Sequence, residues 1–378
     1  MLGFELHSQL AAEHNGAELW GYRRVRCGQL TAVGHSMVVN SQGNSEGTAW
    51  SESNATIQLE KWWAGEQRSS SVLPNDLDWF KARSVQSYEE LADTTSTAQV
   101  HPSQFTVAVA NLAERAGARI IFGTVEHINC TDKEGAPEST VPITSCHDWS
   151  QKKIVSVEYT DKVTSKKHNF PATTVVLAAG PWTSTLLPNL HMSPLRAHSI
   201  SIKVSRPISA YCLFTQITMK NAPELGMNGL LSTSSSVKTI SPEIYSRPDN
   251  EIYICGQGDV NVPLPSPTEV VAVSEQRCQD IVAAAASISD EIARGQVTGR
   301  RACYLPVVDS SLSKNPLIGQ TGLEGLLLAT GHSCWGILHA PATGKAISEL
   351  IFDGEVSCMQ PGNLDPRTII FKRNEHIS

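Results

Sequence analysis

The sequence predicts an α/β fold, and three observations support this prediction. A helical stretch begins at Pro102 and ends at Gly117, and β-type segments follow it. "TTVVLAAG" (residues 173–180) is a continuous apolar run, which is typical of a strand buried on both faces. "GLLLATG" (residues 325–331) is a further apolar strand that leads directly into a helix.

In the first part of the chain, near-helical spacing of apolar residues predicts a helix from Phe4 to Leu19. "YRRVRCGQLTAVG" predicts two strands joined by a tight turn at Gly28. Residues 41–54 are rich in Ser, Gly and Asn and predict a loop, and we expect residues 54–67 to be helical. Residues 119–128 predict strand, and the polar residues 129–153 predict a loop.

In the second part, "KIVSVEYT" (residues 153–160) alternates apolar and polar residues like a half-buried strand. Residues 199–260 indicate strands, and the Ala-rich residues 267–293 indicate a helix. The last helix follows Gly331 and is expected to run to Asp353 and stop at Gly354.

Composition excludes several classes of protein. A net charge of -7 and a pI of about 6.0 argue against nucleic-acid binding, which needs a basic face. The nine cysteines form no C-x-x-C pair, so neither a metal site nor a thioredoxin-like site is expected. Scattered thiols and an N-terminus without signal-peptide character favour a cytoplasmic protein. The longest apolar runs are far shorter than the roughly 20 residues of a transmembrane helix.

The segment "GHSCWGILHAPATGKAISELI" (residues 331–351) contains the strongest candidate site. It fails the G-x-S-x-G pattern of a serine hydrolase and the spacing of a phosphate-binding loop. What remains is a glycine and a helix N-terminus, whose free amides and partial positive charge favour a group that becomes negative, such as a reduced flavin. Trp335 and Ile337 would form its walls. An ordinary strand-to-helix turn with Gly331 at positive φ is the alternative.

A second candidate segment, "VVLAAGPWTSTLLP" (residues 175–188), ends a buried strand with Ala178, Ala179 and Gly180. Small residues at the carboxyl end of a strand permit the close approach of a ligand. Close packing of a sheet against a helix also requires small residues, so this alternative stays open.

Together these segments resemble the D-amino-acid oxidase superfamily of FAD-dependent oxidoreductases, of the glycine oxidase and sarcosine oxidase type. "VHPSQFTVAVANLAERAGARIIFGTVEHI", "ACYLPVVDSSLSKNPLIG" and "LDPRTIIFKR" extend the resemblance over most of the chain. Segments such as "LAAEHNGAELWGYRRV" are similar to a fungal group of FAD oxidoreductases.

The resemblance implies two interleaved domains. An FAD-binding, glutathione-reductase-like domain would comprise residues 1–50, 101–200 and 301–378, and a mixed-sheet substrate domain would comprise residues 51–100 and 201–300. The resemblance also implies that Val125 contacts the adenosine through its backbone, and that His332 either contacts the flavin or only stabilises the turn. Trp182 is a cofactor contact or a core residue. The other implied cofactor-binding residues are Ala178, Ala179 and Gly180 beside the diphosphate and ribitol, and Gly331, Ser333, Trp335, Gly336, Ile337 and Leu338 around the flavin.

The chain departs from the family pattern in two places. The N-terminal strand, G-x-G-x-x-G turn and helix are not found, so we expect a truncated N-terminus that lacks a βαβ unit of roughly 30 residues. The resulting apolar flank and open strand edge predict poor expression or purification without flavin. Leu305 stands where relatives that oxidise amino acids often carry an arginine, which leaves a carboxylate substrate in doubt.

These observations predict an FAD-dependent oxidoreductase that oxidises a C–N bond of a small amine or amino acid by hydride transfer to flavin, with oxygen as the acceptor. No catalytic residue is identified, because this chemistry depends mainly on positioning over the flavin. The alternative is a truncated or repurposed, non-enzymatic protein that keeps the fold without FAD. Cys303 is either a buried thiol or, by resemblance, a covalent flavin attachment site that Arg300 and Arg301 would activate.

Overall fold

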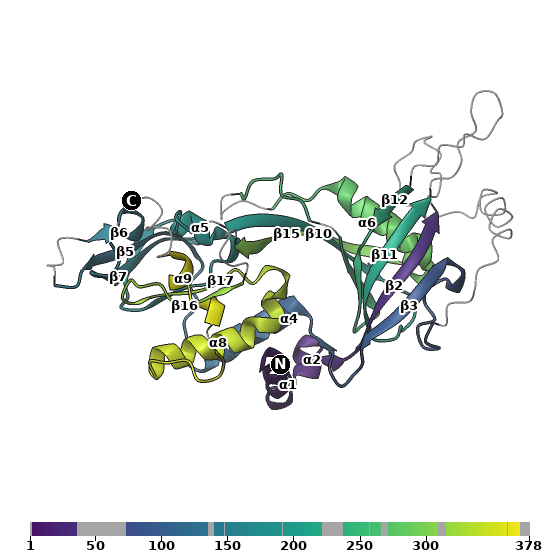
Figure 1. Cartoon of the computed structure of the whole chain (residues 1–378), viewed down its shortest axis with the longest axis horizontal. Helices are drawn as coiled ribbons and strands as arrows, with labels where there is room; N and C mark the ends of the chain where they lie inside the picture. The colour runs from purple at the N-terminus through teal and green to yellow at the C-terminus, as the bar shows by residue number, and fades with distance from the viewer. Residues whose placement is uncertain are drawn as a thin grey trace, which may run out of the picture.

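The structure is a computed structural model that describes residues 2–35, 73–134, 140–146, 148–190, 192–220, 237–256, 258–265, 271–308, 315–360 and 362–370. Two parts of the molecule are connected by the long strands β10 (Met192–Lys203) and β15 (Gln296–Val308), as Figure 1 shows. The predicted α/β fold with mixed sheets is confirmed. None of the helices in these ranges is both long and apolar enough to cross a membrane.

The larger sheet has eight strands in the order β15-β10-β14-β13-β11-β2-β3, with β12 paired to β11. β11 and β2 are parallel, and the other neighbours are antiparallel. Its further strands are β2 (Arg26–His35), β3 (Val85–Ala92), β11 (Tyr211–Lys220), β12 (Val237–Ile240), β13 (Glu243–Arg247) and β14 (Glu251–Cys255).

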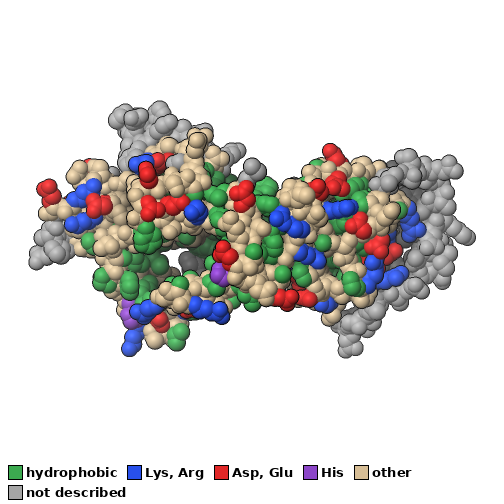
Figure 2. Space-filling view, turned by 90° about the horizontal axis from the view of Figure 1, so that it is seen from below, with side chains coloured by type: hydrophobic (Ala, Val, Ile, Leu, Met, Phe, Trp, Pro, Cys, Tyr) green, Lys and Arg blue, Asp and Glu red, His purple; other side chains and the backbone are tan. Residues whose placement is uncertain are grey.

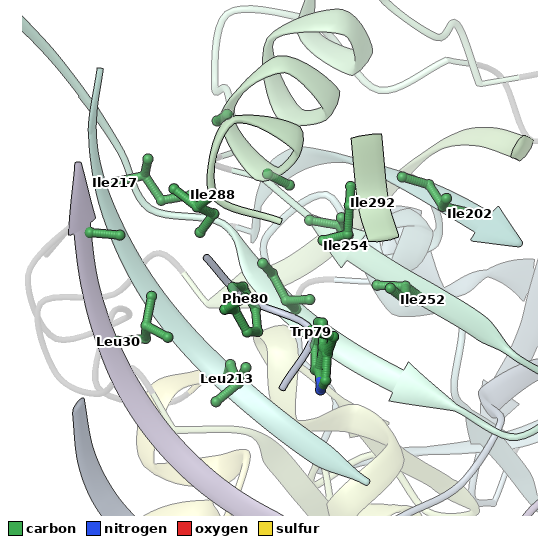
Figure 3. Packing of buried hydrophobic residues seen from close by; sticks show 14 of the residues in the cluster. Leu30, Trp79, Phe80, Ile202, Leu213, Ile217, Ile252, Ile254, Ile288 and Ile292 are labelled. Carbon is green, nitrogen blue, oxygen red and sulfur yellow. The ribbon is translucent and has the colours of Figure 1, made fainter. Parts of the chain in front are cut away.

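One face of this sheet forms the main hydrophobic core under α6 (Glu275–Ile288) and α7 (Asp290–Arg294). Figure 3 shows Trp79 and Phe80 between the strands and these helices, with ring centroids 4.3 Å apart. The Ser274 hydroxyl caps α6 by accepting from the backbone N–H of Arg277. Each fully buried Ile or Leu side chain contributes about 1.5–3 kcal/mol, so this core dominates the stability of the larger sheet.

The other part contains two small sheets. One has the antiparallel order β6-β5-β7-β8, and in the other β17 pairs with β16 antiparallel and with β9 parallel. A second core cluster is shared by both sheets. The strands are β5 (Gly123–Asp132), β6 (Val141–Pro142), β7 (Lys152–Asp161), β8 (Lys167–Pro171), β9 (Val175–Leu177), β16 (Leu317–Gln320) and β17 (Leu326–Thr330).

α8 lies below the two small sheets in Figure 1. α8 packs on β16 and β17 and also contacts α1, while α2 packs against α4. The short pair β1 (Arg23–Arg24) and β4 (Ala98–Gln99) lies close to them in the sequence. The helices here are α1 (Leu2–Glu13), α2 (Gly16–Trp20), α4 (Pro102–Arg115), α5 (Thr183–Leu186), α8 (Gly336–Phe352) and α9 (Arg367–Ile370).

Two predicted elements at the start of the chain are wrong. The helix expected from Phe4 to Leu19 is two helices, because Asn15 adopts a left-handed conformation with φ of 53°. The tight turn expected at Gly28 is absent from the described residues 26–35, where β2 is continuous. A Cβ atom at Gly28 would lie 2.5 Å from the Tyr88 ring on β3, so this glycine makes room for an aromatic neighbour.

Several other elements agree with the prediction. α4 begins at Pro102, Gly117 has φ of 99°, and α8 stops before Gly354, which has φ of 84°. β5 begins later than expected and extends to Asp132, so the first residues of the predicted loop 129–153 are strand. The loop predicted at 41–54 and the helix predicted at 54–67 lie outside the described residues.

The division into domains stays a prediction. β2, which belongs to the range 1–50, pairs with β11, which belongs to the range 201–300. β10 and β15 contribute to the larger sheet but end beside the smaller sheets.

We predict that Gly28→Ala destabilises the fold by about 1–3 kcal/mol, because the added methyl group would overlap the Tyr88 ring. Thermal unfolding of the single variants and of Gly28→Ala/Tyr88→Ala measures the effect. The double variant should lose less stability than the two single losses added together; strict additivity would contradict the proposed overlap.

Candidate cofactor site

The site begins where β17 ends and α8 starts. Gly331 has φ of 81°, and a Cβ there would lie 2.5 Å from the side chain of Val308 at the end of β15. Only glycine meets both constraints, and its positive φ agrees with the strand-to-helix turn predicted as the alternative. Ser333 also has a positive φ, 51°, which is uncommon for a residue other than glycine. The chain therefore makes a tight, constrained turn before Gly336 opens α8.

The two sequence-predicted segments meet at this turn. β9 and β17 run parallel, and the hydroxyl groups of Thr183 and Thr330 both donate to the carbonyl oxygen of Gly180, at 2.8 and 3.2 Å. Their two oxygens are 3.1 Å apart. Both threonines are buried. Sequence reasoning missed them, although a polar residue that directly ends an apolar strand, as Thr330 does, is a usable signal.

Gly336 is the position that fits a cofactor. Its φ of -56° is ordinary for a helix, and a Cβ atom added there would have the Cβ of His332, 3.9 Å away, as its nearest neighbour. Neither the backbone nor a protein neighbour therefore requires glycine here. The space beside it belongs to an open hollow of about 360 Å³ lined by Val176, Ala178, Ala329, His332, Gly336, Ala340, Thr343, Gly344 and Ile347.

This hollow is mainly apolar. Figure 2 shows hydrophobic side chains gathered around a hollow in the left half of the molecule. Val176 is 37% exposed whereas Leu177 is buried, so the prediction that this strand is buried on both faces is wrong. The open side of β9 faces the hollow through Val176, because successive side chains of a strand point to opposite faces.

His332 is held in place by a side-chain contact. Its Nε2 lies 3.0 Å from the hydroxyl oxygen of Thr343, which is further along α8. Burial lowers the pKa of His332, and the nearby His339 lowers it further. The imidazole is therefore neutral at physiological pH. This contact supports a role in stabilising the turn, and it leaves the edge of the ring in the lining of the hollow.

The remaining predicted flavin contacts lie on different sides of the turn. Trp335 and Leu338 are 55% and 39% exposed. Ile337 packs with Trp20 and Phe105, outside the residues that line the hollow, and its carbonyl oxygen lies 2.7 Å from Nε2 of the buried His7. α1 thereby supports the first turn of α8 from the side.

Trp182 and Val125 lie apart from the hollow lining. The Trp182 indole donates to the carbonyl oxygen of Pro265 at 2.9 Å, a contact that favours a structural role for this side chain. Val125 lies on β5, opposite Tyr159, in the four-stranded sheet. The predicted backbone contact between Val125 and adenosine stays a prediction.

The surroundings of Cys303 do not match a reactive thiol. The residue is exposed, so the expectation that it is a core thiol is wrong. Desolvation by surrounding protein atoms raises the pKa of its thiol, the opposite of activation. Arg300 pairs with Glu275 at 2.9 Å, and Arg301 donates to the Ser201 hydroxyl, so both have other partners.

The face of the larger sheet opposite the main core is a further candidate surface. Glu243 accepts from the hydroxyl of Tyr245 and, at 3.5 Å, from the thiol of Cys255. Burial, followed by the Glu243 charge, raises the pKa of both donors, so they remain protonated. Sequence reasoning missed this group, although alternation in "EIYSR" and "EIYIC" places these side chains on one face.

Comparisons with known proteins show the family of this chain. The family model described as FAD dependent oxidoreductase (DAO) matches residues 46–350. The chain belongs to this family. The cofactor of the family is FAD, and the open position beside Gly336 fits such a group.

Two yeast relatives share the family. The chain is 32% identical over 313 residues to "Putative oxidoreductase TDA3" of Saccharomyces cerevisiae, a match that covers 80% of this chain and 57% of that protein. It therefore spans little more than half the length of that relative. A putative oxidoreductase of Schizosaccharomyces pombe is 29% identical over 97% of this chain and 80% of its own length.

Solved structures support the fold. The glycine oxidase of Geobacillus kaustophilus superposes with a TM-score of 0.60 at 16% identity, over 96% of this chain and 80% of that one. The L-proline dehydrogenase of P. horikoshii superposes with a TM-score of 0.57 at 14% identity, over 98% of this chain and 82% of that one.

We predict that stability falls as the pH drops from about 7.5 to about 5, partly because His332 remains neutral in the fold. Below its unfolded pKa of about 6.5, the unfolded chain takes up a proton that the folded chain takes up only at lower pH. In His332→Gln, the midpoint of thermal unfolding should fall less over this range. The same substitution at the exposed His168 is the control, and an equal pH dependence in wild type and His332→Gln would contradict the prediction.

Proposed function

We propose that the chain binds FAD with the flavin ring beside His332 and Gly336, and oxidises a C–N bond of a small amine or amino acid. The open position at Gly336 is the observation that carries this proposal. A glycine that neither its backbone nor a protein neighbour requires leaves room for a flat ring. The strained Ser333 turn immediately before it is a feature that clusters at ligand-binding sites.

The residues of the turn have separate roles in this proposal. The first amides of α8 and its helix dipole stabilise negative charge next to them. Gly180, held by Thr183 and Thr330, presents its backbone to the ribitol and diphosphate side. Neutral His332 fixes the turn through Thr343. When bound, FAD accepts a hydride from the substrate, and the protein supplies binding and orientation.

The hollow extends beyond the proposed ring position, along α8 to Ile347. A Cβ at Gly344 would meet no atom within 4 Å, and Ala340 one turn earlier is also small. We propose that this stretch accommodates the rest of the cofactor together with a further backbone element, because small side chains permit such close approach.

We place the substrate against the open face of the larger sheet. Two arginines of this sheet have partners: Arg247 pairs with Glu251 at 2.9 Å, and Arg301 contacts Ser201. The two donors described for the Glu243 carboxylate, Tyr245 and Cys255, are neutral. Leu305 pairs with Leu195 and supplies no charge. A substrate with a positively charged amino group therefore suits this face better than one recognised only through a carboxylate.

The proposed ring position predicts that Gly336→Val weakens FAD binding at least tenfold, because a branched side chain would fill the space. Titration of the purified chain with FAD, followed by flavin fluorescence, measures the affinity. Ser348→Val, an exposed position on the same helix, is the matched control. Equal affinity in both variants would contradict the ring position, and no FAD binding by the unsubstituted chain would favour the non-enzymatic alternative.

The proposed substrate position predicts that Glu243→Gln raises KM for cationic amines by about 10–100-fold, because a charged hydrogen-bond partner is worth about 1.5–3 kcal/mol. Oxygen consumption by the FAD-loaded chain across a panel of small amines and amino acids tests it, with Glu89→Gln on the exposed edge strand β3 as the control. An unchanged KM for every active substrate would place the amine elsewhere.

A further inference from the structure

Two buried cysteines lie in direct contact in the smaller part of the molecule. Cys130 is on β5, and Cys146 directly follows the short helical turn Ile143–Ser145. Their sulfur atoms are 2.7 Å apart, closer than the about 3.5–4.0 Å at which even non-bonded carbon atoms rest. The exposed fractions are 0% for Cys130 and 8% for Cys146. The fold therefore brings two reduced thiols, sixteen positions apart, almost to bonding distance.

The surrounding structure restrains both residues. Cys130 pairs with Val141 across the β5–β6 ladder, and the backbone N–H of Cys146 donates to Ile143. Ile128, Ile154 and Leu177 pack around them in one core cluster. Well-packed neighbours leave little room for the sulfur atoms to move apart.

We propose that Cys130 and Cys146 form a disulfide by exchange with a low-molecular-weight disulfide such as oxidised glutathione. The partly accessible Cys146 thiolate attacks one sulfur of the small disulfide, forms a mixed disulfide and releases one small thiol. The Cys130 thiolate then attacks the Cys146 sulfur, forms the Cys130–Cys146 bond and releases the second small thiol. The two protons of the protein thiols pass to the two released thiolates, so the protein is oxidised by two electrons and the small disulfide is reduced by two.

The cysteine pair belongs to the same core cluster as the strand that leads to the cofactor turn. Leu177, in the same core cluster, directly precedes Ala178 and the constrained turn at Gly180. Burial raises the pKa of the Cys130 thiol, so the second step is slow at neutral pH. Because both sulfur atoms are buried, the bond, once formed, is shielded from attack by other thiolates. The oxidised chain should unfold at a higher temperature, since a cross-link restricts the unfolded state.

The test uses the whole chain, without added flavin, incubated with oxidised glutathione under native conditions. Peptide mapping without reduction should recover a peptide pair joined through Cys130 and Cys146, lighter by two hydrogen atoms. The exposed Cys334 should instead carry glutathione. The thermal unfolding midpoint should rise on oxidation and return after reduction.

Cys146→Ser should abolish both the cross-link and the reversible rise in the unfolding midpoint. Cys278→Ser, which removes a fully buried thiol in α6, should preserve both. The proposal is overturned if the folded wild-type chain takes up glutathione only at exposed thiols, a result that needs no variant. It is also overturned if the cross-linked peptides join other cysteines. Neither result depends on whether the chain binds FAD.

Discussion

The antiparallel pairing of β10 with β15 is the constraint on which the rest of the structure depends. It is continuous from Met192 and Val308 to Lys203 and Gln296, with one irregularity near Ser201. At one end these strands belong to the larger sheet and its core. At the other end the Val308 side chain packs against Gly331, and the Met192 sulfur lies beside the Thr330 hydroxyl. The backbone ladder thus fixes the proposed substrate face relative to the cofactor turn.

A charged cluster around the buried Asp259 carboxylate supports this ladder. Asp259 pairs with Arg196 on β10 and with Arg277 on α6, each at 3.1 Å. Removing one partner from such a cluster leaves an uncompensated buried charge, which costs more than the intact pair contributes. The cluster holds the segment that includes Pro263 and Pro265, whose carbonyl oxygens accept from Tyr304 and Trp182. Contacts from both parts of the molecule therefore converge on one connecting segment.

The cofactor turn combines rigid and open features. Hydroxyl groups, a left-handed glycine and His332 fix the backbone, whereas Gly336 and the small residues of α8 leave one side uncovered. Two exposed apolar side chains lie there, Val176 in the lining of the hollow and Trp335 in the turn itself. Exposed apolar side chains gathered in one place are typical of a region that contacts a ligand.

The sequence by itself determined the local features that depend on neighbouring residues. α4 begins at Pro102 and ends before Gly117, and α8 ends before Gly354. The two apolar strands that end in glycine indicated the candidate site and the family. These signals act through backbone sterics and short-range periodicity, so they can be identified within one segment of the sequence. Only the tertiary structure decided what depends on distant partners. Gly28 makes room for Tyr88, Val176 faces an open hollow, Ile337 packs against Trp20, and the Thr183 hydroxyl lies 3.1 Å from that of Thr330. Such contacts join residues far apart in the chain, and no spacing within one segment encodes them.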